Sequence, residues 1–281
     1  SRLPVLSLRH GLAAGALVAV LAGTAAAATL TNVFAPTRVA PVTLSHSDIS
    51  TLADFMGLGQ QGGNVLGGFA TPSGALTRSF GTIRWSSSGM ARTVPTLAAA
   101  SSAAGFAVPL PSTLPAGVGR PRQFVVQPHV KVTVDVRAGV PSIGGSSVVL
   151  DAGPAVLAAY GSSGGPDLPT LGILTMPRPT AVASGATLRQ IEAFVLEQPG
   201  VPADLAQEIR LLGDVGTTLP VPVPARATER SVEVAGSPGV LVTDPSNIAA
   251  GVVWEDDAGV LHAVAGLIDQ KDVLGVASQI G

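Results

Sequence analysis

A glycine-flanked serine is the first candidate for catalysis in this sequence. Gly161-Ser-Ser163-Gly-Gly165 matches the GxSxG pattern, in which a serine on a tight strand-to-helix turn acts as a nucleophile. That pattern needs a helix directly after the turn, but Pro166-Asp-Leu-Pro169 follows here. We therefore expect a glycine turn at this position, and a serine hydrolase using Ser163 is kept as the least favoured functional hypothesis.

A glycine-rich loop is the candidate for a nucleotide site. Gly57-Leu-Gly59-Gln-Gln-Gly62 matches the dinucleotide pattern GxGxxG, which requires a strand before it and a helix after it. Here a short amphipathic helix, capped by Ser47, is expected before the loop, and glycine-rich coil follows it. The order is therefore wrong for a nucleotide site, and we expect a loop.

The histidines and acidic residues do not have the spacing of a metal site. No HExxH occurs, no two histidines are spaced as zinc ligands, and the acidic turn at Asp256 and Asp257 has too few oxygen donors for a calcium loop. Aspartate is favoured in such a turn for backbone reasons. We expect no metal and no cofactor at any of the four histidines, which are His10, His46, His129 and His262.

The remaining residues that could serve a site are expected to be structural. The two tryptophans fall in predicted strands, where a core position is more usual than a ligand cleft. The acidic residues of two predicted helices stand opposite apolar faces, which predicts a solvated surface. These residues are Trp85, Trp254, Glu192, Glu197, Asp204 and Glu208.

The composition excludes several classes of protein. Only 12% of the 281 residues are charged and the net charge is −2, so the chain has no electrostatic footprint for nucleic acid. It contains no cysteine, which excludes disulfides, thiolate nucleophiles and cysteine-ligated metals. With 34 glycines and 23 prolines, we expect many turns and short elements.

Residues 11–30 carry no charge and are long enough to cross ~30 Å of hydrocarbon as a helix. Arg2 and Arg9 precede this segment, and the next charge is Arg38, which places the N-terminus in the cytoplasm and the bulk of the chain outside. A cleaved signal peptide with a cleavage site in Ala25 to Ala28 is the alternative. The apolar run over residues 11–30 is longer than the ~7–15 residues usual for the apolar region of a signal peptide, so we favour a single-pass cell-membrane protein.

The expected domain organisation follows from this segment. Residues 1–10 form a cytoplasmic end that we expect to be truncated, 11–30 the transmembrane helix, 31–46 an extended stalk and 47–281 one extracytoplasmic domain. Small residues at i+4 spacing give the helix a stripe that permits close packing against another helix, although any alanine-rich span produces such a stripe. The stripe consists of Gly11, Gly15, Ala19, Gly23 and Ala27.

The exported domain is predicted to be α+β with mainly antiparallel sheet. Val130, Val132, Val134 and Val136 alternate with polar residues, which predicts a strand with one core face and one face toward water. Such a sheet favours antiparallel pairing. Further strands are predicted at 80–85, 147–150, 155–160, 171–176, 231–235, 240–243, 251–255 and 260–265, and a small helix at 95–104.

A helical hairpin is predicted over 187–213, inserted among these strands. Thr187-Leu-Arg-Gln190 forms a capping box, Pro199-Gly200 ends the first helix and Pro202 begins the second. Residues 219–225, with alternating prolines, are predicted to be a polyproline-like spacer. A last helix is predicted to begin at Asp269 as its N-cap.

The C-terminal part carries a resemblance. Gly251-Val-Val-Trp254, an acidic turn, Leu261-His-Ala-Val-Ala-Gly266 and the helix Val273-Leu-Gly-Val-Ala277 resemble the end of an extracytoplasmic domain of unknown function from Gram-positive bacteria. Ala103 to Pro109, Leu114 to Gly117 and Gly153 to Tyr160 resemble earlier parts of the same family, in which the domain often hangs from a single span with a cytoplasmic anti-sigma-factor module. With the span, the resemblance covers about two thirds of the chain. It implies a tethered sensory or regulatory domain without enzymatic activity.

Two functional hypotheses of different classes therefore stand before the hydrolase. The first is a membrane-anchored sensory or regulatory binding domain, linked to sigma-factor regulation and facing the bilayer and a protein partner. The second is a carrier or accessory protein of an exporter, which holds lipid or another apolar ligand in a deep groove between sheet and helices. Neither hypothesis involves nucleic acid, and the sequence does not define an oligomeric state.

Overall fold

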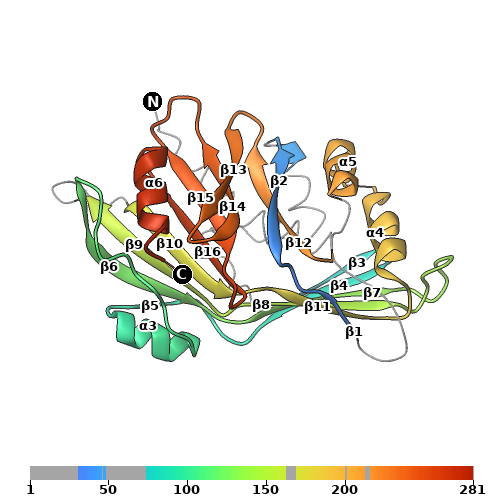
Figure 1. The fold of residues 1–281 in the computed structure, drawn as a ribbon. Coiled ribbons are helices and arrows are strands. Elements are labelled where there is room, and N and C mark those ends of the chain that lie inside the picture. The colour runs from blue at the N-terminus through green and yellow to red at the C-terminus, as the bar shows by residue number, and fades with distance from the viewer. Residues whose placement is uncertain are drawn as a thin grey trace. The chain divides into compact units, whose positions relative to one another are not determined.

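The computed structural model describes residues 31–45, 47–48, 74–162, 169–199, 201–212 and 216–280 (Figure 1). The chain divides into two compact units that alternate along the sequence. Unit 1 comprises Ser1–Met90, His129–Ala152 and Pro179–Ala225, and unit 2 comprises Ala91–Pro128, Gly153–Arg178 and Arg226–Gly281. The sequence predicts one continuous extracytoplasmic domain over 47–281; the two units are described separately below.

Unit 1 contains an antiparallel sheet in which six strands are described, in the order β1-β11-β8-β7-β4-β3. The valine alternation of β7 has the predicted consequence, because Val136 is buried and Val132 and Val134 pack against the core of the unit. The strands are β1 (Thr31–Phe34), β3 (Gly74–Arg78), β4 (Gly81–Ser87), β7 (Val130–Val136), β8 (Ser147–Ala152) and β11 (Thr180–Ser184).

Two segments that the sequence predicts as unpaired chain form a parallel strand pair instead. β2 (Arg38–Leu44) pairs along its length with β12 (Thr218–Pro224). Val42 and Leu44 are buried, as are the first six residues of β12. The prolines of β12 are tolerated because they occupy alternate positions, so the backbone N–H groups that they remove would all lie on one side of the strand. The predicted stalk over 31–46 and the polyproline spacer over 219–225 are thus wrong: β1 and β2 belong to the fold, and β12 lies in its interior.

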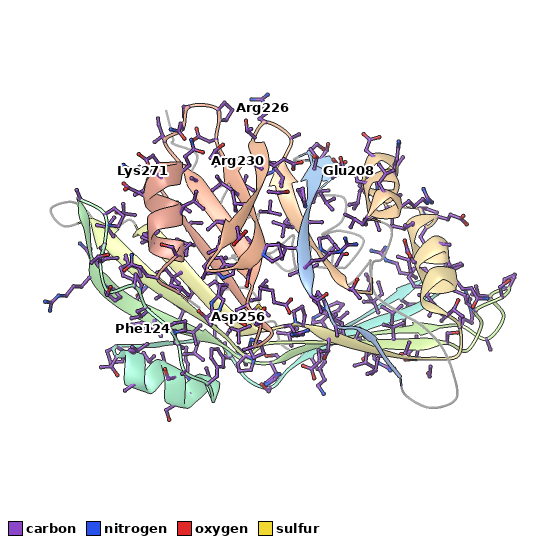
Figure 2. All side chains as sticks on the ribbon, in the orientation of Figure 1. Phe124, Glu208, Arg226, Arg230, Asp256 and Lys271 are labelled. Atoms are coloured by element: carbon purple, nitrogen blue, oxygen red, sulfur yellow. The ribbon has the colours of Figure 1, made fainter. Side chains whose placement is uncertain are left out.

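The predicted helical pair is present as α4 (Leu188–Leu196) and α5 (Ala203–Leu211). α4 begins with the predicted capping box, in which Gln190 N donates to Thr187 Oγ1 and Thr187 N donates to Gln190 Oε1. Both helices contribute buried side chains to the core of unit 1, where Phe80 and Phe194 meet edge to face. Glu208 of α5, labelled in Figure 2, accepts a hydrogen bond from the backbone N–H of Thr43. This carboxylate therefore joins α5 to β2 at an exposed position, a contact that the sequence does not predict.

Unit 2 contains a sheet in which eight strands are described, in the order β13-β14-β15-β16-β10-β9-β6-β5. All neighbouring strands are antiparallel, and β13 to β16 form a meander of consecutive hairpins. The strands are β5 (Arg92–Val94), β6 (Val118–Gln127), β9 (Ala155–Ser162), β10 (Pro169–Pro177), β13 (Thr228–Val234), β14 (Ser237–Thr243), β15 (Ala250–Glu255) and β16 (Val260–Gly266).

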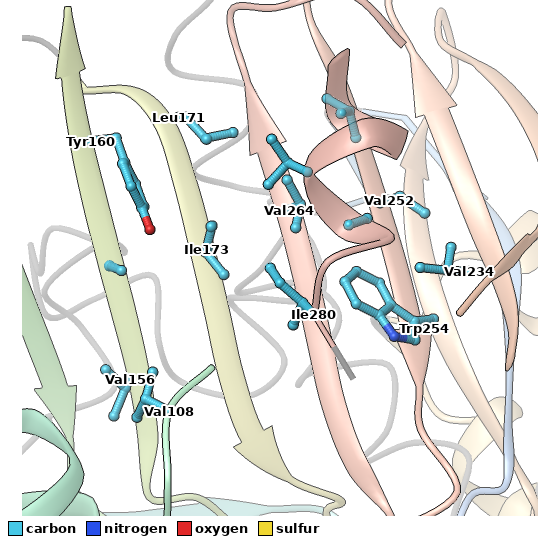
Figure 3. Close-up of a cluster of buried hydrophobic side chains, with 14 of the residues drawn as sticks. Val108, Val156, Tyr160, Leu171, Ile173, Val234, Val252, Trp254, Val264 and Ile280 are labelled. Atoms are coloured by element: carbon cyan, nitrogen blue, oxygen red, sulfur yellow. The ribbon is translucent and has the colours of Figure 1, made fainter. Parts of the chain in front are cut away.

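Two helices pack on this sheet. α3 (Leu97–Ala104) is capped by Thr96 and ends at Gly105, whose φ of 79° suits glycine. α6 (Gln270–Ala277) is capped by Asp269, which accepts from Asp272 N at 2.8 Å, as the sequence predicts. Figure 3 shows Ile280, just after α6, in the same cluster as Ile173, Val264 and Trp254. The cluster also includes Tyr160, whose pKa burial raises to about 12.

The predicted α+β class with mainly antiparallel sheet and a C-terminal helix is thus confirmed for the described residues. Residues 11–30 lie outside them, and with them the small-residue stripe Gly11, Gly15, Ala19, Gly23 and Ala27. Within the described part of the chain, no helix combines the length and hydrophobicity that a bilayer crossing requires.

Candidate functional site

The acidic turn between β15 and β16 is the centre of a buried polar cluster in unit 2. Asp256 N donates to Val260 O at 3.0 Å and Gly259 N donates to Asp256 O at 2.9 Å, which closes the hairpin. Gly259 has a φ of 76°, a conformation that glycine adopts without strain. The turn also fixes the side chain of Asp256, because its Oδ1 accepts from Val260 N at 2.8 Å.

The register of the hairpin places His262 directly opposite Trp254, and Thr175 of β10 lies opposite His262 on the other side. The rings of Trp254 and His262 stack with centroids 5.1 Å apart at 26°. Nε2 of His262 is 3.1 Å from Oδ2 of Asp256. Among the described residues, His262 Nδ1, Thr175 Oγ1 and Trp254 Nε1 are buried without a hydrogen-bond partner.

An ion pair flanks this histidine. Glu255, whose side chain is 3% exposed, lies with Oε1 3.1 Å from Nη2 of Arg178, which is 29% exposed. The backbone of Arg178 is fixed by the same turn, because its N–H donates to Gly259 O at 2.9 Å. The turn therefore positions both an imidazole–carboxylate pair and a guanidinium–carboxylate pair. Asp256 is labelled in Figure 2.

Burial dominates the electrostatics of the cluster. Desolvation lowers the pKa of His262, and the Asp256 carboxylate only partly offsets this effect. Desolvation alone would raise the pKa of Asp256. Hydrogen bonds from the Val260 N–H and from His262, together with the charge of the His262 ring, outweigh desolvation, so the pKa of Asp256 is lowered. Burial also raises the pKa of Glu255, against the attraction of Arg178.

The chemical capacity of the cluster is limited by access. Thr175, His262 and Asp256 offer the residue types of a hydroxyl–imidazole–carboxylate set, but a nucleophile must be hydrogen-bonded to its base and reachable by substrate. Thr175 and His262 are 0% and 2% exposed, and Thr175 Oγ1 has no hydrogen-bond partner among the described residues. The arrangement instead makes the stability of unit 2 depend on the protonation state of His262.

The other candidate residues do not join this cluster. His129 directly precedes β7 and is exposed, with Nδ1 3.2 Å from Asp151 Oδ1. Trp85 is buried in the core of unit 1, as predicted. Among the described residues, no group of three or more histidine, cysteine or acidic residues could hold a metal. Other candidates lie outside the described residues; they are His10, His46, Gly57 to Gly62 and Ser163.

Sequence reasoning missed the partners of the cluster, although one signal was available. The sequence explains Asp256 by the backbone of its turn alone, and it carries no local signal at Arg178 or Thr175. Once 256–259 is taken as a hairpin turn, strand pairing alone places residue 254 opposite residue 262. The adjacent pairing with β10 is a long-range contact with no local sequence signal.

Unit 1 contains a separate, open pocket of about 320 Å³ beside the β3–β4 turn and the end of α4. It is lined mostly by polar side chains, and so differs from the deep apolar groove that a lipid carrier would need. The lining residues are Thr77, Arg78, Ser79, Phe80, Gln198 and Pro199.

Comparisons of the chain with protein-family models, with curated proteins and with solved structures gave no match.

Proposed function

We propose that this chain is a non-enzymatic, membrane-anchored extracytoplasmic domain that binds a partner and regulates a cytoplasmic response. The observation that carries the proposal is the uncharged segment 11–30, which is long enough to cross a bilayer and directly precedes the folded strands. The resemblance of 251–277 to tethered domains of Gram-positive bacteria supports the regulatory role, including a link to sigma-factor control.

The structure bears on this proposal through the residues that carry the resemblance. Trp254, Val264 and Ala277 are fully buried, and Gly259 makes the hairpin turn. These residues therefore hold the unit together rather than contact a ligand. A partner is then recognised by exposed residues on the surface of the units. This suits a binding domain whose membrane anchor either relays the binding signal or only holds the domain at the membrane.

The test combines fractionation with transcript measurement. The full chain is expected in the membrane fraction after alkaline washing, and replacing residues 11–30 with a cleavable signal peptide is expected to release it. In the native host, deletion of residues 31–281 with the span retained is expected to change a set of transcripts that share one alternative sigma factor. Unchanged transcripts together with altered envelope lipid would contradict the regulatory role and favour a lipid carrier.

A further inference from the structure

The end of the unit 1 sheet at which β1 begins is defined by strand pairing. Thr31 pairs with Ala183 near the end of β11, and Ser184 pairs with Ser147 at the start of β8. The next pairings continue along the same end to the β3–β4 turn, where Arg78 pairs with Gly81. Because Thr31 follows Leu30 directly, this end is the one that a membrane anchor at 11–30 would reach first.

Two arginines are found at this end. Arg137 directly follows β7 and is exposed, and its backbone N–H donates to Phe80 O at 2.8 Å, which joins the end of β7 to the β3–β4 turn. Arg78 ends β3 and lines the pocket described above. Ser79 and Gln198 add a hydroxyl and an amide to that pocket, so its polar groups suit a phosphate-sized anion. Acidic residues also lie near this end: Asp135, whose Oδ2 is 2.5 Å from Nη2 of Arg84, and Glu197, which is exposed at the end of α4.

We infer that this end of the sheet is a binding site for anionic lipid headgroups at the membrane surface. Basic side chains near an anionic leaflet are attracted over about a Debye length, ~10 Å at moderate salt. β1 and β3 are the outermost described strands of this sheet and are separated by five strand spacings, about 24 Å. The start of β1 and the β3–β4 turn can therefore both lie on one bilayer surface. The inference rests on the proposed function only in requiring that residues 11–30 anchor the chain.

The absence of cysteine permits a direct test with single-cysteine variants of the full chain. Gly139, in the loop after β7, and Gly89, in the loop after β4, are both exposed, and a Cβ at either would contact nothing within 4 Å. They lie at opposite ends of the same sheet, because Ser87 pairs with Val130. A dye is attached to Gly139→Cys or Gly89→Cys, and the chain is reconstituted in vesicles whose lipid headgroups carry a spin-label quencher.

The expected result is several-fold stronger quenching at position 139 than at position 89 in vesicles containing phosphatidylglycerol. The difference should shrink in phosphatidylcholine alone and in the Arg78→Gln/Arg137→Gln variant. The matched control is Lys131→Gln, which removes a charge from the opposite end of β7 and should leave the difference unchanged. Glu197→Gln should increase the difference. Equal quenching at both positions in chains that resist alkaline washing would overturn the inference while leaving the anchor intact.

Two further arms separate the alternatives. Inorganic phosphate should reduce quenching no more than sodium chloride of equal ionic strength. A loss with phosphate alone would assign the pocket to free phosphate and overturn the inference. Loss of the chain from the vesicles on alkaline washing would contradict the anchor itself, and the inference would fall with it.

Discussion

Nε2 of His262 lies 3.1 Å from Oδ2 of Asp256, in a pair whose imidazole is 2% exposed and stacked on Trp254. His129 and Asp151 form the same kind of pair at 3.2 Å on the surface of unit 1, with the histidine side chain 50% exposed. The two pairs therefore allow the effect of burial on an imidazole–carboxylate pair to be measured within one chain.

The stability of unit 2 is expected to fall as the pH is lowered below about 6.5, the ordinary pKa of histidine. Because burial lowers the pKa of His262 in the folded state, the unfolded chain binds the proton first in this range. Asp256 extends this loss of stability to lower pH, because its pKa is lowered in the folded state. The ionised Asp256 carboxylate stabilises the fold above its ordinary pKa, and this stabilisation is lost as the folded state takes up the proton. Urea unfolding of the full chain in detergent, followed by Trp254 fluorescence in a Trp85→Phe background, measures the effect.

The control for this pH dependence is the surface pair. His262→Gln should flatten the dependence between pH 5 and 7, a window around the ordinary histidine pKa. His129→Gln, which removes an exposed histidine from unit 1, is the control variant. The same slope in both variants would show that His262 is not the responsible group.

Replacing Arg178 with alanine should destabilise unit 2 by about 3 kcal/mol, the usual effect of breaking a buried ion pair. The loss should grow with pH, because the pKa of Glu255 is already raised by burial and its carboxylate would then lack its guanidinium partner. Adding Glu255→Gln to Arg178→Ala should restore part of the stability at neutral pH. A loss that is independent of pH and is not rescued would mean that Arg178 acts through packing alone.

The two faces of β7 should respond differently to a new charge. Val134 lies between Ile83 and Val148 and packs on the core of unit 1, so Val134→Asp should cost at least about 2 kcal/mol. Thr133 lies opposite Arg84 on the other face, so Thr133→Asp should change stability by less than about 1 kcal/mol. Urea midpoints followed by Trp85 fluorescence in a Trp254→Phe background compare them, and similar losses would invalidate the face assignment.

The N-cap of α6 should contribute a separate, smaller amount. Asp269→Ala is expected to destabilise unit 2 by about 1 kcal/mol, because the Asp272 N–H would lose its acceptor. Asp269→Ser should retain most of the stability, since a serine hydroxyl can accept the same bond. Equal losses in the two variants would indicate that the side chain of Asp269 has a role beyond capping.

Local signals in the sequence predicted the local structure well. The Thr187–Gln190 capping box, the Asp269 cap and the alternation of Val130 to Val136 all act within a few residues, and each is present in the structure. The turn at 256–259 was predicted for the same reason.

The errors concern contacts between distant segments. The proline-rich residues 219–225 have no neighbours in sequence that reveal their pairing with β2, which lies about 180 residues earlier. The sequence around His262 likewise gives no sign that β10 will cover it. Strand partners were therefore the information that local patterns lacked, both for the stalk and for the buried cluster.

The central claim, an anchored chain with its folded part outside the cell, is tested most directly by labelling single cysteines in intact cells. The Gly89→Cys variant, at an exposed position of unit 1, should react with a membrane-impermeant maleimide in whole cells. The His10→Cys variant, before the uncharged segment, should react only after the membrane is permeabilised, and both should remain in the membrane fraction. Labelling of His10→Cys in intact cells, or recovery of a folded chain that begins near Ala28 in the medium, would contradict the account.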